Sequence, residues 1–228
     1  MRQDTTLDLW ESVFQNQTWG KYPPIPLVRF IAKHFHPVRD RSELRVLELG
    51  SGPGANLWFL AREGFTVYGI DGSETACRLA RQRLEEENLR ERIGELLVGD
   101  YFEHLKYFPD EFFDAVIDIE SLYCNSFERS RKIMKSVFQK LKKNGKFFSM
   151  TFAENSYGFE KGNEIDYHAI LPTDGPMAGK GFSRFTTKSD IYDLYEHENS
   201  KIINIQRQDL ILDETRSIKE WIIEAEKR

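Results

Sequence analysis

Short apolar segments alternate with amphipathic ones between residues 44 and 152. The apolar segments have the length and composition of buried strands and lie at 45–49, 66–71, 94–100, 112–119 and 146–152. Strands that alternate with helices form βαβ units, which give a mostly parallel sheet with helices on both faces. The chain is therefore predicted to fold as a doubly wound α/β protein.

The remaining periodic segments complete this arrangement. Apolar residues at helical spacing predict helices at 7–17, 24–35, 53–64, 73–89, 130–145 and 187–198. Two further strands, 201–214 and 217–228, are separated so briefly that they form an antiparallel hairpin. With the five strands above, the hairpin gives a sheet of seven strands.

A single domain is expected over residues 1–228. An N-terminal helical cap (1–40) precedes the core (44–152), and a C-terminal helix and hairpin (187–228) end the chain. Between them, residues 153–186 are rich in Gly, Pro and Asn and have no period. A connection of this length is typical of a functional loop or lid, so we expect this insertion to contact a substrate.

The composition of the chain limits which partners and which cellular compartment we expect. The net charge is -5, which gives no general attraction for nucleic acid, and the basic stretch 128–146 is interpreted as a solvated helix face. No apolar run approaches the ~18 residues of a membrane span, and the N-terminus does not resemble a secretory signal. Two cysteines, Cys77 and Cys124, lie outside any metal-ligand spacing. We expect a cytoplasmic protein, monomeric or homodimeric, without a metal site.

The first strand runs into a glycine-rich loop, "VLELGSGPGANL", at 46–57. Such a loop suits a dinucleotide, a nucleotide-like cofactor or a plain turn. Gly50, Gly52 and Ala55 meet the dinucleotide fingerprint G-x-G-x-x-G/A. Pro53, however, removes a backbone N–H from the surface that would donate to a pyrophosphate. This detail favours the nucleotide-like cofactor.

Written as E-x-G-x-G-x-G, the loop resembles the first motif of the class I S-adenosylmethionine-dependent methyltransferases. Four later segments resemble motifs of that family in the same order: "YGIDGS", "LLVGDYF", "FFDAVIDIESLYC" and "LKKNGKFFSMTF". The resemblance covers about residues 44–152, and the terminal hairpin fits the antiparallel seventh strand typical of that family's fold. It implies S-adenosylmethionine as cofactor and S-adenosylhomocysteine as product.

The resemblance also implies a set of cofactor contacts. Asp71 would accept hydrogen bonds from the ribose hydroxyls, and Asp100 would contact the adenine amino group beside Tyr101 or Phe102. The alternative for each acid is that it only caps the following helix. The full set of expected cofactor residues is Trp19, Tyr22, Glu48, Gly50, Ser51, Gly52, Gly54, Asn56, Asp71, Gly72, Ser73, Asp100, Tyr101, Phe102, Asp118, Ile119 and Glu120.

Candidates for the chemistry follow the fourth strand or lie in the insertion. Glu120 is a base or a residue that orders its loop, Tyr123 faces the acceptor site, and His168 is the histidine expected as base. Arg184 would pair with an acidic substrate group or cap local structure.

The expected reaction is methyl transfer to an oxygen or nitrogen of a small molecule, because the opening segment is similar to that of small-molecule methyltransferases. A sugar, a surface-polysaccharide precursor and a secondary metabolite are candidate acceptors by analogy. The Asn-Pro-Pro-aromatic tetrad of DNA amino-methyltransferases is absent. A protein or RNA methyltransferase, an NAD-binding oxidoreductase and a non-catalytic binding module stay open as alternatives.

Overall fold

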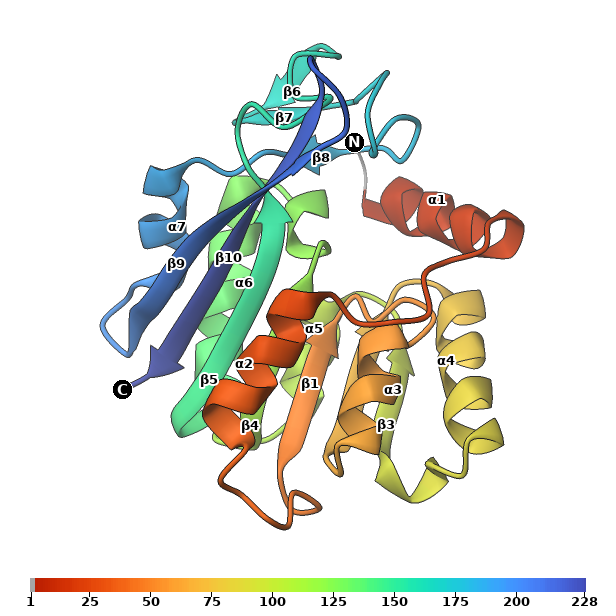
Figure 1. Ribbon diagram of the computed structural model, residues 1–228, viewed down its shortest axis with the longest axis vertical. Coiled ribbons are helices and arrows are strands. Elements are labelled where there is room, and N and C mark those ends of the chain that lie inside the picture. The colour runs from red at the N-terminus through yellow and green to blue at the C-terminus, as the bar shows by residue number, and fades with distance from the viewer. Residues whose placement is uncertain (1–2) are drawn as a thin grey trace.

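A seven-stranded sheet organises the computed structural model, which describes residues 3–228 (Figure 1). Its strands lie in the order β3-β2-β1-β4-β5-β10-β9. Their bounds are β1 Arg45–Leu49, β2 Thr66–Asp71, β3 Ile93–Val98, β4 Phe113–Ile119, β5 Leu141–Phe152, β9 Ser200–Ile211 and β10 Ser217–Lys227. The predicted α/β class, the seven strands and the terminal hairpin are confirmed.

The strand order reverses between β1 and β4. Both strands run parallel to their neighbours, and β10 is antiparallel to β5 and to β9. In an open parallel sheet, the carboxyl ends of the strands on either side of such a reversal diverge and leave a crevice. The loops after β1 and β4 therefore border the position where a ligand is expected.

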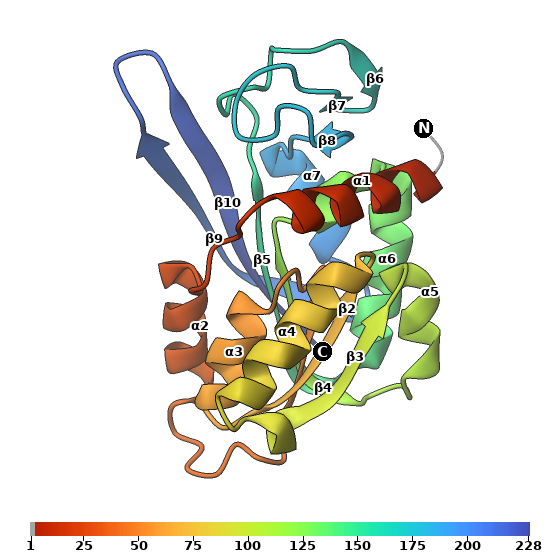
Figure 2. The same ribbon diagram turned by 90° about the vertical axis from the view of Figure 1, so that its right-hand side faces the viewer.

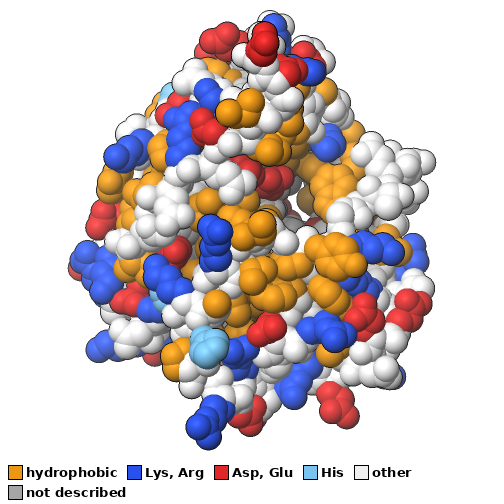
Figure 3. All heavy atoms as spheres, in the orientation of Figure 1, with side chains coloured by type: hydrophobic (Ala, Val, Ile, Leu, Met, Phe, Trp, Pro, Cys, Tyr) orange, Lys and Arg blue, Asp and Glu red, His pale blue; other side chains and the backbone are white. Residues whose placement is uncertain are grey.

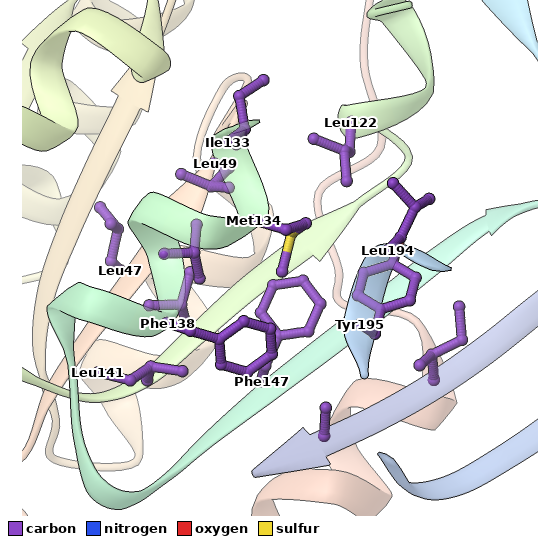
Figure 4. Close-up of a cluster of buried hydrophobic side chains, with 14 of the residues drawn as sticks. Leu47, Leu49, Leu122, Ile133, Met134, Phe138, Leu141, Phe147, Leu194 and Tyr195 are labelled. Atoms are coloured by element: carbon purple, nitrogen blue, oxygen red, sulfur yellow. The ribbon is translucent and has the colours of Figure 1, made fainter. Parts of the chain in front are cut away.

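Helices cover both faces of the sheet. The helices are α1 Gln3–Asn16, α2 Ile25–Phe35, α3 Ala55–Arg62, α4 Glu74–Glu86, α5 Tyr101–His104, α6 Phe127–Lys140 and α7 Lys188–Tyr195. One buried cluster joins α2, α3 and α4 to one face. A second joins α6 and α7 to the other, with Leu47, Phe138, Phe147 and Tyr195 among its side chains (Figure 4).

Successive side chains along a strand belong alternately to these two clusters. Phe147 belongs to the α6 side and Phe148 to the α2 side, and Leu47 and Val46 divide in the same way. Successive strand residues point to opposite faces. Both faces are covered, so the strands read as continuous apolar runs.

Helix α1 and the insertion lie over the C-terminal end of the sheet. Helix α1 crosses above α3 and α4, and residues 153–186 extend beyond the ends of β5 and β10 (Figures 1 and 2). The insertion contains a small antiparallel sheet of β6 Glu164–Asp166, β7 Ala169–Ile170 and β8 Ser183–Arg184. The sequence did not predict these strands, because two or three residues are too few to show alternation.

The predicted boundary at 145 is wrong. Helix α6 ends at Lys140 and β5 begins at Leu141, whereas Asn144 and Gly145 were expected to end the helix. Asn144 has a φ of +63°, and the pairing with β4 skips from Leu141 to Lys146 across this stretch. The two residues form an irregularity inside the strand, which is the other setting in which Asn and Gly adopt positive φ.

Asp118, expected to contact a cofactor, is fully buried in β4 and lies outside the residues that line the cavity described below. Its Oδ1 accepts hydrogen bonds from the backbone N–H of Leu122 at 2.8 Å and of Ser121 at 3.2 Å. Its Oδ2 accepts from Ser149 Oγ at 2.7 Å. The side chain thus holds the loop after β4 against β5. Burial, partly offset by these bonds, raises the pKa of Asp118 to about 6.

Asp118→Asn is expected to raise the free energy of unfolding by about 1–3 kcal/mol at pH 8, since the buried carboxylate has a raised folded-state pKa and its ionisation opposes folding. The gain shrinks as the pH falls through about 6, where the native Asp118 becomes protonated. Urea unfolding at pH 8 and pH 5 measures both effects, with exposed Asp110→Asn as control. A difference between native and variant that does not change with pH would contradict this account.

Candidate functional site

A cavity of about 550 Å³ lies between the carboxyl ends of the strands and their cover of α1 and the insertion. Figure 3 shows the molecule hollowed on this face, with hydrophobic and acidic side chains at the border. The volume is typical of small-molecule sites. The cavity sits at the strand-order reversal, where the sequence placed the ligand.

The glycine loop after β1 forms the floor of this cavity. A Cβ at Gly50 would lie 1.9 Å from Ser121 Oγ, so a side chain there would push the loops after β1 and β4 apart. At Gly52, by contrast, the nearest atoms are those of the Phe14 ring, 3.6 Å away, and φ is +50°. Gly52 therefore leaves open the surface that faces the cavity.

Asp71 ends β2 and supports the same loop. Its Oδ2 accepts a hydrogen bond from Gly52 N at 2.7 Å, and its Oδ1 accepts from Ser73 N at 2.8 Å. The residue lies in the cavity wall although only 6% of it is exposed. Burial raises its pKa to about 6 despite the two backbone hydrogen bonds. A carboxylate has further lone pairs to offer a ligand hydroxyl.

Three buried polar side chains of the wall carry atoms without a partner among the described residues. These atoms are Glu48 Oε2, Ser51 Oγ and Asn56 Oδ1. Glu48 is 1% exposed, its other oxygen accepts from Asn56 Nδ2 at 2.6 Å, and burial raises its pKa well above the usual range. Buried polar atoms are nearly always paired, so three together indicate a polar ligand.

Asp100 lies in the wall after β3. Its Oδ1 caps α5 by accepting from Phe102 N and Glu103 N, and it also pairs with Arg129 Nη2 at 2.7 Å. Tyr101 Oη accepts from Asn125 Nδ2 at 2.6 Å, which ties α5 to the loop after β4. Phe102 itself lies outside the wall, 5.2 Å below the Arg129 guanidinium.

Aromatic side chains cover the cavity from α1 and the segment after it. Trp10, Phe14 and Trp19 contact one another with ring centroids 5.3–5.9 Å apart, and all three line the wall. Lys180 of the insertion lies with Nζ 5.0 Å from the Trp19 ring centroid. Tyr22 reaches the wall but is 74% exposed.

Helix α1 is held in place by Glu11. Its carboxylate accepts from Ser73 Oγ, from Thr75 Oγ1 at 2.6 Å and from Thr75 N at 3.1 Å. These hydrogen bonds lower the pKa of Glu11 to about 2. Ser73 also caps α4 by accepting from Ala76 N. Ser73 was expected to contact the cofactor, but it lies outside the cavity wall, where its hydroxyl donates to Glu11.

The residues after β4 form the end of the cavity beneath the insertion. Glu120 is half-buried in the wall, and burial followed by contact with Glu220 raises its pKa well above the usual range. Tyr123 is 1% exposed, and its hydroxyl donates to Met177 Sδ at 3.3 Å. Because burial also raises the pKa of Tyr123, this phenol is a poor base.

His168 does not fit the expected general base. It lies outside the cavity wall, its Nδ1 is 3.0 Å from Asp190 Oδ2, and its ring stacks on Tyr167. These contacts fasten the insertion to α7. Arg184 is 1% exposed, and its guanidinium donates hydrogen bonds to Asn125 O and Thr186 Oγ1.

The structure brings most of the expected residues into one wall: Trp19, Tyr22, Glu48, Gly50, Ser51, Gly52, Asn56, Asp71, Gly72, Asp100, Tyr101, Ile119, Glu120 and Tyr123. It places five outside that wall: Gly54, Ser73, Phe102, Asp118 and His168. Gly54 is the N-cap of α3, and a Cβ there would meet Ala80 at 2.7 Å.

Sequence reasoning missed several wall residues, chiefly Asn125, Arg129, Phe152, Met177 and Lys180. Arg129 had been assigned to a solvated helix face, although it is the first basic residue after a strand end, which was the available signal. Lys180 and Met177 lie in an aperiodic segment, in which no sequence signal marked them as wall residues.

Within residues 3–228, no group of three or more His, Cys, Asp and Glu side chains is placed to hold a metal ion. Over the same residues, none of the helices has both the length and the hydropathy needed to cross a membrane.

Comparison with known proteins agrees with the geometry. Residues 46–145 match the model of a family described as a methyltransferase domain. A release factor glutamine methyltransferase from Gloeobacter violaceus is 38% identical over 81 residues, and this match spans 35% of the chain and 27% of that relative. The chain thus spans about a quarter of the relative's length.

Solved structures share the fold at low identity. A SAM-dependent methyltransferase from Methanosarcina mazei superposes with a TM-score of 0.67 at 22% identity, covering 82% of this chain and 93% of that one. Magnesium protoporphyrin IX methyltransferase from Synechocystis, solved with bound SAM, gives 0.64 at 15% identity, covering 98% and 92%. Residues 46–145 are thus similar to a methyltransferase domain, and the chain as a whole shares the fold of these solved methyltransferases.

Proposed function

We propose that this protein transfers a methyl group from S-adenosylmethionine to an oxygen or nitrogen of a small molecule. The observation that carries the proposal is the cavity wall at the glycine loop, where Glu48, Ser51 and Asn56 are buried with unpaired polar atoms. A ligand with an amino acid end and a ribose supplies the missing partners. Asp71 would accept from the ribose hydroxyls, and Asp100 and Tyr101 would lie against the adenine.

The bound cofactor supplies a methyl group on a cationic sulfur, ready for in-line displacement. The residues of this chain would position the acceptor and exclude water, which is the main protein contribution to such a transfer. The aromatic cover of Trp10, Phe14 and Trp19 suits a cation, since aromatic faces attract positive charge. These side chains line the cavity, and the Phe14 ring lies close to Gly52 of the glycine loop.

A small acceptor fits the covered cavity better than a macromolecule does. Helix α1 and the insertion lie over the site, and a net charge of -5 does not favour RNA. The structural relative from Synechocystis acts on magnesium protoporphyrin IX by its name. Protein methylation is the second candidate, because one relative is named a release factor glutamine methyltransferase. We expect a cytoplasmic enzyme, monomeric or homodimeric, that acts on neither nucleic acid nor membranes.

Asp71→Asn is expected to weaken S-adenosylhomocysteine binding about 10- to 100-fold, because hydrogen bonds to a charged acceptor contribute about 1.5–3 kcal/mol. Binding to the native protein should also weaken as the pH falls below about 6, where Asp71 becomes protonated. Isothermal titration calorimetry between pH 5 and pH 8 measures both changes.

The controls for this titration are NAD and FAD as ligands and exposed Asp110→Asn as variant. None of the three should reproduce the result. Binding of NAD in preference to S-adenosylhomocysteine would contradict the proposed cofactor and favour an oxidoreductase.

Methyl transfer itself can be followed with labelled S-adenosylmethionine. The native protein is incubated with dialysable, protein and RNA fractions of the source cells, and label is expected in the dialysable fraction. Asp71→Asn should lose this incorporation at low cofactor concentration and regain part of it at high concentration. Label confined to protein or RNA would refute the small-molecule acceptor while leaving the cofactor intact.

A further inference from the structure

Strand β9 forms one edge of the seven-stranded sheet. The strand order ends at β9, and within residues 3–228 its only strand partner is β10. Residues 206–212 are all exposed, and Ile211 among them is 75% exposed. Figure 2 shows the tip of the β9–β10 hairpin projecting away from the body of the molecule. An exposed strand edge of this kind can pair with another chain.

The hydrogen bonds on either side of the hairpin show which backbone groups of β9 face outward. Lys219 of β10 lies opposite Asp209, but its C=O accepts from Ala153 N on the β5 side. Leu212 N, by contrast, donates across the hairpin to Arg216 O. Backbone groups alternate in direction along an antiparallel strand. The N–H and C=O groups of the odd-numbered residues therefore point to the open edge: Ile205, Arg207, Asp209 and Ile211.

The side chains around Gln208 follow the same chemical order in both directions. Residues 205–211 read "IQRQDLI", with a charged residue on either side of Gln208 and an isoleucine at each end. Two copies paired antiparallel about a two-fold axis at Gln208 place Arg207 of each copy opposite Asp209 of the other. The same register places Ile205 opposite Ile211. Opposed residues of opposite charge and opposed β-branched residues both stabilise antiparallel pairs.

The backbone agrees with this register. Arg207 and Asp209 both present their N–H and C=O groups to the open edge, so each such pair exchanges two hydrogen bonds. A two-fold axis at either of these residues would set like charges opposite each other. An axis at Gln206 or Leu210 would set a charged residue opposite an isoleucine. The axis at Gln208 therefore satisfies both the backbone and the charges.

The guanidinium of Arg207 has capacity for a second carboxylate. Its Nε donates to Asp209 Oδ1 at 3.1 Å within the same strand, and its centre lies 5.6 Å from the centroid of the Trp221 ring. Among the side chains of residues 3–228, only this Nε contact joins Arg207 to an acid. A guanidinium carries five N–H donors in a planar fork. The Nη groups are therefore left to bond Asp209 of another copy.

We propose that two copies of this chain associate through β9, antiparallel and about a two-fold axis at Gln208, into one continuous sheet. The partner is a second copy because the charge order of β9 is complementary to itself. The exposed side chain of Ile211 is then covered by Ile205 of the other copy. Residues 205–211 do not line the cavity, so the proposal does not depend on the methyl transfer proposed above.

The first test is sedimentation velocity of the full chain over a range of concentrations, without ligand. The native protein is expected to dimerise reversibly. Arg207→Asp and Asp209→Arg each leave only like charges around the axis, so each should weaken the dimer at least about tenfold. The double variant Arg207→Asp/Asp209→Arg restores opposite charges and should restore the dimer.

The control for this test is Arg78→Asp on α4, an exposed residue whose reversal changes the net charge as Arg207→Asp does. It should dimerise like the native protein, and circular dichroism checks that every variant is folded. A native protein that stays monomeric up to millimolar concentration would overturn the proposal and leave the edge to an extended segment of another protein. Single variants that dimerise as the native protein does would also overturn it.

The second test measures the register by disulfide formation. Opposite Cα atoms in a non-hydrogen-bonded antiparallel pair lie about 4.5 Å apart, within the range that a disulfide spans. Gln208→Cys is therefore expected to form a linked dimer under mild oxidation. Gln206→Cys is the matched control, because it is exposed on the same face of β9 but its two copies would lie roughly 14 Å apart. Equal linking of both variants, or of neither, would refute the axis at Gln208.

Discussion

The contact between the glycine loop and the loop after β4 sets the geometry of the whole site. Gly50 lies so near Ser121 that no side chain fits between them, and Asp118 holds the Ser121 loop in turn by accepting from its backbone. The reversal of strand order brings these two loops together. Because the cavity floor is built from this contact, Asp71 and Glu120 stand at fixed positions on either side of it.

The wall contains several buried acids, and the free-energy cost of burying them is the best physical argument for a bound ligand. Glu48, Asp71 and Glu120 all have pKa values raised chiefly by burial. Burying carboxyl groups with incomplete hydrogen bonding opposes folding, and a site of this kind is kept where binding requires it. The atoms without a partner cluster at the glycine loop, and Glu120 lies in the wall after β4. The cavity therefore presents buried polar atoms suited to a cofactor at the glycine loop.

Most of the fold, and the residues on the cofactor side of the site, could be predicted from short-range sequence patterns. The strands of the core, the Ser73 cap and the glycine loop follow from short-range composition. The acceptor side did not, because its partners are distant in sequence. Lys180 lies in the aperiodic insertion, and only the fold shows that His168 lies outside the wall, against Asp190 and Tyr167. The position of Asp118 also depends on contacts that are distant in sequence, because its burial against Ser149 places it where it holds a loop.

A crystal structure of the complex with S-adenosylhomocysteine tests the central claim most directly. The account predicts the ligand in the cavity beneath α1, with its polar groups within hydrogen-bond distance of Asp71 and of the unpaired atoms of Glu48, Ser51 and Asn56. The sulfur should point toward the Glu120 end. A ligand bound elsewhere, or one that leaves these three atoms unpaired, would contradict the account.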